Sequence, residues 1–203
     1  MPDLSEQLQL SRCPHCQVDT PSLHRQAILQ TTNHLGADKR FWKVYSCARC
    51  GGAILASAEN DGAPIKELYP PALEVDAAIP TPAREYLQQA IDSLHAPAGS
   101  VMLCASAVDA MLKALALKKG TLNERIDKAA EQHLITPEMA VWAHEVRLDA
   151  NDPRHADEAN PVPTDQDARK AVEFGLALGE FLFVLPSKVR RGLEMAKQQP
   201  SAG

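Results

Sequence analysis

Residues 100–119 read SVMLCASAVDAMLKALALKK, and this segment decides the expected fold. Apolar side chains recur on nearly every side of a helix with 3.6 residues per turn, which predicts a central or interface helix. Ser100 is a favoured cap at its start, and Gly120 is a favoured stop after its end. Cys104, inside the apolar run, is expected to be a small buried residue. The rest of the chain must therefore supply helices that pack around this segment.

Helix-start signals recur on both sides of residues 100–119. Each is a threonine followed within three positions by a proline or an acidic residue, and they occur at Thr81, Thr121, Thr136 and Thr164. Pro186 is expected to end or kink the last helix, and residues 187–199 to continue as a short basic amphipathic segment. Short connections between such helices are typical of a bundle. The sequence thus predicts a mainly α fold, with a helical bundle over residues 81–203.

Two cysteine pairs precede the bundle, CPHC at residues 13–16 and CARC at residues 47–50. Zinc binds four thiolates in a tetrahedron, and a C-x-x-C turn directs two of them at one metal. Gly51 and Gly52 permit the tight turn that the second pair requires. Strand-like segments surround both pairs. The sequence predicts a small β zinc ribbon over residues 1–58, with a structural Zn²⁺ held by Cys13, Cys16, Cys47 and Cys50.

Other uses of these cysteines fit less well. Two disulfides or a redox C-x-x-C are the alternatives, but a cytosolic chain disfavours structural disulfides and no βαβ pattern surrounds either pair. Four protein ligands leave no open coordination position, so chemistry at the metal is not expected. The nearby His15, His24 and His34 are interpreted as ordinary surface histidines. Residues 59–80, rich in proline, glycine and acidic side chains, predict an extended linker.

Charge and hydropathy limit the classes of function. The net charge is -5, yet residues 1–52 hold six basic residues against four acidic ones. This bias suits an anionic partner, whereas the acidic remainder argues against broad, non-specific nucleic-acid binding. No apolar stretch approaches the ~20 residues of a membrane helix, and no secretory leader pattern is seen. A cytoplasmic protein without a membrane partner is expected.

The segment HEVRLDANDPRHADE, residues 144–158, holds the candidate catalytic residues. Arg147, Asn151 and His155 are four positions apart, so an unbroken helix would place them on one face. An imidazole can take a proton from a ribose 2'-hydroxyl, and a guanidinium can stabilise charge that grows on the phosphoryl oxygens. An amide can position the substrate. Such a set can support chemistry on a phosphodiester, and no metal would be required.

Two features of the same segment favour a structural role instead. Pro153 disfavours helical backbone at Asp152, so the helix is expected to end near Asn151. Acidic side chains outnumber arginines around the site, and they would repel a polyanion. Under this alternative Arg147 pairs with acids across the bundle, and His155 holds the turn through a hydrogen bond. The residues alone leave both interpretations open.

Three features together resemble a bacterial domain family of unknown function. They are the four-cysteine ribbon, a YPP linker motif at residues 69–71, and the stretch LNERIDKAAEQHLITPEMAVWAHEVRLDANDPRH at residues 122–155. The family signature, Arg-x-x-x-Asn-x-x-x-His, is matched by Arg147, Asn151 and His155. The family is grouped within the HEPN superfamily of helical bundles, many of which are metal-independent ribonucleases or toxins.

The resemblance implies an HEPN-like, RNA-associated protein that cleaves RNA without a metal and leaves 2',3'-cyclic phosphate ends. Arg147 and His155 would be catalytic, and Asn151 would support them. In active members the arginine and histidine of two subunits face each other, which implies a homodimer with an RNA or a protein partner. The alternative is a non-catalytic adaptor module that binds nucleic acid or protein and keeps a structural zinc site.

Overall fold

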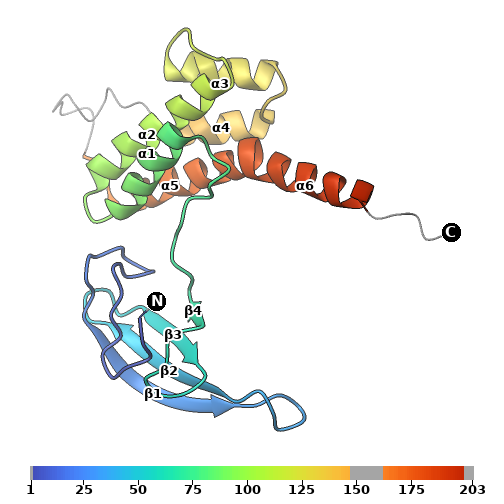
Figure 1. The fold of residues 1–203 in the computed structure, drawn as a ribbon. Coiled ribbons are helices and arrows are strands. Elements are labelled where there is room, and N and C mark those ends of the chain that lie inside the picture. The colour runs from blue at the N-terminus through green and yellow to red at the C-terminus, as the bar shows by residue number, and fades with distance from the viewer. Residues whose placement is uncertain (1, 147–161, 199–203) are drawn as a thin grey trace. The chain divides into compact units, whose positions relative to one another are not determined.

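The computed structural model describes residues 2–146 and 162–198 of the chain (Figure 1). It divides into two compact units, Met1–Leu73 and Glu74–Gly203. The first unit is built on a β-sheet and the second on helices. Within the described residues, no helix combines the length and the apolar composition that are needed to cross a bilayer.

The prediction of a mainly α fold is wrong. The structure is 45% helix and 17% strand, and it includes a four-stranded antiparallel sheet, so the chain is a mixed α and β protein. The sheet is larger than the expected ribbon because its fourth strand, Glu67–Tyr69, lies in the stretch that the sequence predicted to be a linker. Three residues followed directly by two prolines gave too short a pattern to indicate a strand.

The sheet has the strand order β1-β2-β3-β4, and each neighbouring pair is antiparallel. Its strands are β1 (Leu23–Thr31), β2 (Arg40–Cys47), β3 (Ala53–Ala58) and β4 (Glu67–Tyr69). A shift in register between Arg25 and Ala27 interrupts the pairing of β1 with β2. An irregularity of this kind bends a strand and increases its twist.

One face of this sheet packs against the segment that precedes the first cysteine. Leu4 and Leu8 of that segment are buried, and the Tyr45 hydroxyl donates a hydrogen bond to the Ser5 carbonyl oxygen at 2.6 Å. Burial, together with the nearby carboxylates, raises the pKa of Tyr45 to about 12. Lys43 lies beneath the same segment, with its Nζ 2.6 Å from the Asp61 carboxylate. The residues before Cys13 are therefore part of the core of the unit.

The second unit is helical. Its elements are α1 (Thr81–Asp92), α2 (Pro97–Ala114), α3 (Leu122–Glu131), α4 (Pro137–Glu145), α5 (Asp165–Gly179), the π-helical segment η2 (Glu180–Val184) and α6 (Leu185–Gln198). Side-chain caps at Thr121, Thr136 and Thr164 confirm three of the predicted helix starts. Thr81 is instead the first residue of its helix, which Pro80 precedes without a side-chain cap.

The central helix predicted from residues 100–119 is confirmed as α2, although it begins at Pro97 and ends at Ala114. It packs against α1 and α5, and Cys104 within it is fully buried, with its thiol donating to the Ala171 carbonyl oxygen at 2.8 Å. Burial raises the pKa of this thiol to about 12. A Cβ at Gly175 would lie 2.9 Å from the Cys104 sulfur, so α5 approaches α2 closely because that position is glycine.

Of the two outcomes expected at Pro186, the helix does not end there, because its backbone adapts before the proline. A proline in a helix lacks the N–H donor and clashes with the carbonyl four residues earlier. Here η2 widens the preceding turn, and the Leu185 N–H donates to the Glu180 carbonyl oxygen, five residues back. The chain then continues as α6.

A buried ion pair links α2 to α3. The Arg125 guanidinium contacts the Asp109 carboxylate, and its Nε donates to the Thr121 carbonyl oxygen at 3.1 Å. The Arg125 side chain is 9% exposed, whereas Lys113, which also pairs with Asp109, is 52% exposed. Asp109 therefore neutralises a buried charge in one contact and a solvated charge in the other.

Candidate metal centre

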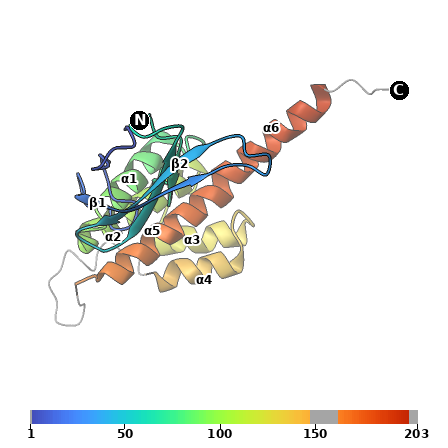
Figure 2. The same ribbon diagram turned by 90° about the horizontal axis from the view of Figure 1, so that it is seen from below.

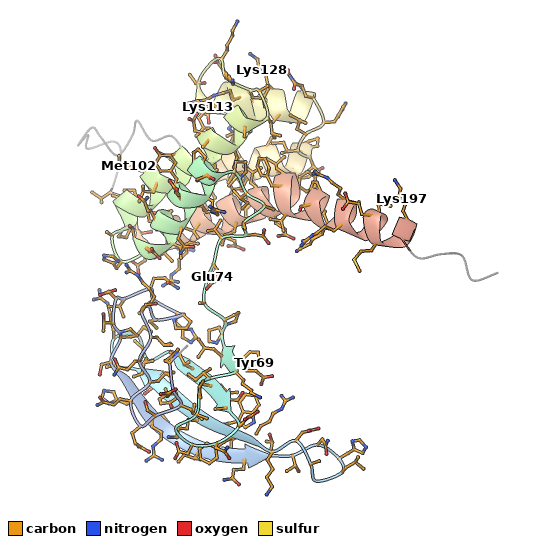
Figure 3. All side chains as sticks on the ribbon, viewed as in Figure 1. Tyr69, Glu74, Met102, Lys113, Lys128 and Lys197 are labelled. Carbon is orange, nitrogen blue, oxygen red and sulfur yellow. The ribbon has the colours of Figure 1, made fainter. Side chains whose placement is uncertain are left out.

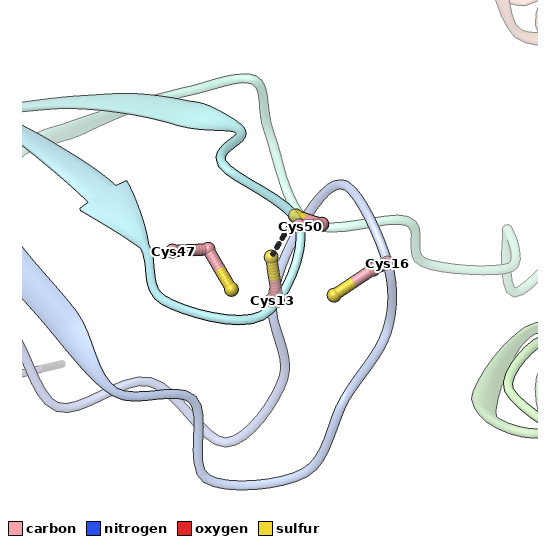
Figure 4. A group of neighbouring side chains, drawn as sticks. All are labelled: Cys13, Cys16, Cys47 and Cys50. Atoms are coloured by element: carbon pink, nitrogen blue, oxygen red, sulfur yellow. Dashed lines mark hydrogen bonds between the residues drawn. The ribbon is translucent and has the colours of Figure 1, made fainter.

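Four cysteine thiols converge at one end of the first unit (Figure 4). The sulfur atoms of Cys13, Cys16, Cys47 and Cys50 all lie within 4.8 Å of one another, and those of Cys13 and Cys50 are 4.0 Å apart. Sulfurs arranged around one ion at bond lengths of about 2.3 Å lie somewhat under 4 Å apart, so small movements suffice to close the cluster on a metal. The predicted set of four cysteines could hold a metal ion.

The two pairs sit on similar backbone turns. The Gln17 N–H donates to the Cys13 carbonyl oxygen at 2.9 Å, and the Gly51 N–H donates to the Cys47 carbonyl oxygen at 2.8 Å. Both donors have a positive φ, 56° at Gln17 and 73° at Gly51. Glycine adopts such a φ without strain, which explains Gly51 in the second turn. Gln17 is buried and binds the Pro14 carbonyl oxygen through its side-chain amide.

His15 ties the two turns together. Its Nε2 lies 2.7 Å from the Ala53 carbonyl oxygen, just beyond the second cysteine pair. Its ring also covers Gly52, where an added Cβ would lie 2.4 Å from the imidazole Cδ2. The interpretation of His15 as an ordinary surface histidine missed this packing, for which the sequence carried one signal, the second glycine of CARCGG. His15 therefore positions the metal-binding turns and need not bind the metal itself.

Burial changes the acidity of these thiols. It raises the pKa of Cys13 to about 12 and also raises the pKa of Cys50. At Cys47 burial acts in the same direction, but hydrogen bonds from the Cys50 and Arg49 backbone outweigh it and lower the pKa. Thiols that are costly to ionise alone become thiolates when a cation supplies the opposite charge. The donor set thus fits a thiophilic divalent ion.

The sheet face opposite the core presents apolar and aromatic side chains. Residues paired across strands share a face, and the register pairs Leu29 with Trp42, Val44 with Leu55, and Leu55 with Tyr69. The Trp42 and Tyr69 rings are 6.5 Å apart and tilted by 34°. Tyr69 is 51% exposed, and Figure 3 shows it at the edge of the sheet. We call these five residues the open face.

Two basic side chains near the open face form ion pairs with acidic residues. Arg40 pairs with Glu67 at 3.2 Å and remains 55% exposed, and Lys66 pairs with Glu59. Together with Lys39 they line a shallow pocket beside Ser57 and Ala58. Lys43 is one of the six basic residues whose excess over residues 1–52 suited an anionic partner. It is buried between the sheet and the segment that contains Leu4, so it is not available to an anionic ligand.

The predicted catalytic residues Arg147, Asn151 and His155 lie outside the described residues. Helix α4 leads towards them, and Val146 is the last residue described before them. His144, in the last turn of α4, lies 2.8 Å from the Asp127 carboxylate of α3. This contact helps to fix the end of α4.

The helical unit matches a known family model. The model is described as a domain of unknown function, DUF4145, and it matches residues 88–197, more than half of the chain. Neither a search of curated proteins nor a search of solved structures found a match. The expectation of a family of unknown function is confirmed, and the chain belongs to the DUF4145 family.

Proposed function

We propose that the chain is an RNA-associated protein of the HEPN superfamily that works as a cytoplasmic homodimer. In this proposal the ribbon holds a structural Zn²⁺ through its four cysteines and presents the open face to single-stranded RNA. The resemblance of residues 122–155 and the family match over residues 88–197 support the superfamily assignment. The converging thiols support the zinc site, because four clustered sulfurs suit Zn²⁺ well.

The open face is the observation that carries RNA binding. Bases of unpaired RNA stack on exposed aromatic rings, and Trp42 and Tyr69 are neighbours on this face. Arg40 and Lys66 flank it in exposed ion pairs, and such pairs are weak enough to exchange a carboxylate for a phosphate. The apolar side chains of Leu29, Val44 and Leu55 complete this surface. It suits unpaired bases better than it suits double-stranded RNA.

We expect Trp42→Ala to weaken the binding of unstructured RNA. Loss of one stacked base costs roughly 1–3 kcal/mol, which corresponds to an increase in Kd of about 5- to 150-fold. Fluorescence anisotropy with a labelled, unpaired RNA oligonucleotide measures this change at fixed salt. The matched control is Tyr86→Ala, which removes an exposed aromatic ring from α1 and should leave Kd unchanged. Equal effects of the two substitutions, or no RNA binding by the wild type, would refute the role of the open face.

Metal-independent RNA cleavage is the second candidate function. Its support is the family signature at Arg147, Asn151 and His155, which falls inside the residues that match the family model. The histidine would accept the 2'-hydroxyl proton, the arginine would stabilise the phosphoryl charge, and the asparagine would position the substrate. The non-catalytic adaptor is the alternative if this set serves structure.

We expect His155→Ala to slow RNA cleavage strongly while RNA binding persists. The assay uses the zinc-loaded chain without added Mg²⁺, and it identifies 2',3'-cyclic ends on the products. General acid–base catalysis contributes about 10²- to 10⁴-fold, so the loss should be of that size. His95→Ala removes an exposed histidine between α1 and α2 and serves as the control. Cleavage that survives in His155→Ala, or is absent from the wild type, would favour the adaptor.

A further inference from the structure

Helix α6 has an apolar stripe that no other part of its own unit covers in the described residues. At 100° per residue, Leu185, Val189, Gly192, Leu193 and Ala196 fall within one narrow sector of this helix. Leu185, Val189 and Leu193 are 48%, 54% and 59% exposed. Gly192 has nothing within 4 Å of the position where a Cβ would lie. Glycine destabilises an exposed helix. Close packing of a partner against this position would explain why residue 192 is glycine.

The position of α6 keeps this stripe open. Its main contacts are with η2, the segment that leads into it, whereas α4 packs against α3 and α5. Figures 1 and 2 both show α6 running on beyond the other helices of its unit. Figure 3 shows its side chains as far as Lys197 without another helix alongside. A half-exposed row of this kind usually marks an interaction surface.

Charge identifies the kind of surface that fits α6. Basic residues border the stripe, Lys188 on one side and Arg190 and Lys197 on the other, whereas Arg191 and Glu194 project from the opposite side of the helix. Two copies of α6 would therefore repel each other if they paired side by side. The complementary surface is apolar at its centre and acidic around it.

The exposed face of α4 has this complementary composition. Val141 is 59% exposed, and Glu138 and Glu145 lie three positions before it and four positions after it, on the same side of the helix. All three side chains point away from the core, because Ala140 and Ala143 make up the buried side. The α4 face can thus receive an apolar side chain between two carboxylates.

We propose that α6 of one copy packs against the α4 face of a second copy. Val189 and Leu193 would contact Val141, and Arg190 and Lys197 would pair with Glu138 and Glu145. Both pairs are seven positions apart on one side of their helix, so their spacings match. Each copy supplies one α6 and one α4 face, so a two-fold exchange satisfies both surfaces and closes at a dimer. This interface rests on the homodimer proposed above. RNA binding by the open face is measured in a separate experiment, so either proposal can fail while the other holds.

The first test removes the apolar contact. Sedimentation over a range of concentrations gives the mass of the zinc-loaded full chain, which is 22.0 kDa for one copy. The double variant Val189→Gln and Leu193→Gln is expected to raise the dimer Kd by about tenfold or more. Met195→Gln, the control, removes an exposed apolar side chain that lies off the stripe and should leave the Kd unchanged. A monomeric wild type, or equal effects of both variants, would overturn the proposal.

The second test exchanges charges between the two surfaces. One variant carries Arg190→Glu and Lys197→Glu, and the other carries Glu138→Lys and Glu145→Lys. Each alone places like charges at both contacts and should be monomeric. Mixed together, they can form a dimer with one contact of reversed polarity and one of native polarity. Failure of the mixture to dimerise, when each variant keeps the wild-type circular dichroism spectrum, would show that α6 does not bind α4.

Discussion

Cys47→Ser is expected to abolish metal binding and to unfold the first unit, while the helical unit stays folded. Structural zinc in small domains contributes about 10–16 kcal/mol of apparent binding free energy, more than a small sheet gains from its core. The serine hydroxyl is a poor ligand for Zn²⁺, and the three remaining thiols would leave an incomplete site. Elemental analysis gives the bound zinc, and a two-dimensional amide NMR spectrum follows each unit separately. Removal of zinc from the wild type by a strong chelator under reducing conditions should give the same spectrum.

Cys104→Ala is the matched control, since it removes the cysteine of α2 that lies apart from the cluster. Its zinc content should equal that of the wild type. A Cys47→Ser protein that still binds one zinc per chain and keeps its sheet signals would contradict the four-thiolate site. Loss of zinc from Cys104→Ala would point to a site that the clustered sulfurs do not explain.

Asp109→Ala should destabilise the helical unit by about 3 kcal/mol or more. The substitution leaves the Arg125 guanidinium buried without its carboxylate, and breaking a buried pair from one side costs roughly 3–5 kcal/mol. Urea unfolding measures the change in the free energy of unfolding. Trp142 packs against Phe174 in this unit, with the two ring centroids 5.3 Å apart. Its fluorescence reports on unfolding of the unit, provided that Trp42 is first replaced by phenylalanine.

Lys113→Ala tests whether burial or mere pairing with Asp109 accounts for the effect. Lys113 contacts the same carboxylate, but more than half of its side chain is exposed. Exposed pairs contribute about 0–1 kcal/mol, so Lys113→Ala should change the free energy of unfolding little. Comparable losses in the two variants would mean that Asp109 acts through its position in α2 and that the buried charge of Arg125 matters little.

Local chemistry in the sequence predicted those parts of the structure that depend on a few neighbouring residues. The caps at Thr121, Thr136 and Thr164 and the paired cysteines are such features, because side-chain type and spacing along the chain decide them. The strand Glu67–Tyr69 could not be found this way, since its pairing with β3 is what makes it a strand. The same reason explains the mistaken mainly α fold.

Features that depend on tertiary packing could likewise not be predicted from the sequence. Lys43 looked like a cation available for an anionic partner, yet the segment containing Leu4 covers it. His15 looked unremarkable because its partners, Gly52 and Ala53, lie far along the chain. Pro186 carried a sound local signal for a helix end, but the widened turn at η2 removes the clash. The surroundings of the candidate metal centre depend on such long-range contacts, whereas most helix boundaries depend on local sequence.

The buried position of Leu4 has a consequence for synthesis on the ribosome. Its backbone N–H donates to the Ala63 carbonyl oxygen, and the Ile65 N–H donates to the Pro2 carbonyl oxygen. The residues around Leu4 must therefore wait until the chain around Ala63 has been synthesised before they can pack. Contacts of such long sequence separation slow folding and leave apolar side chains exposed in the meantime. Early binding of a metal would shorten this exposure, because one ion would hold the two cysteine pairs together.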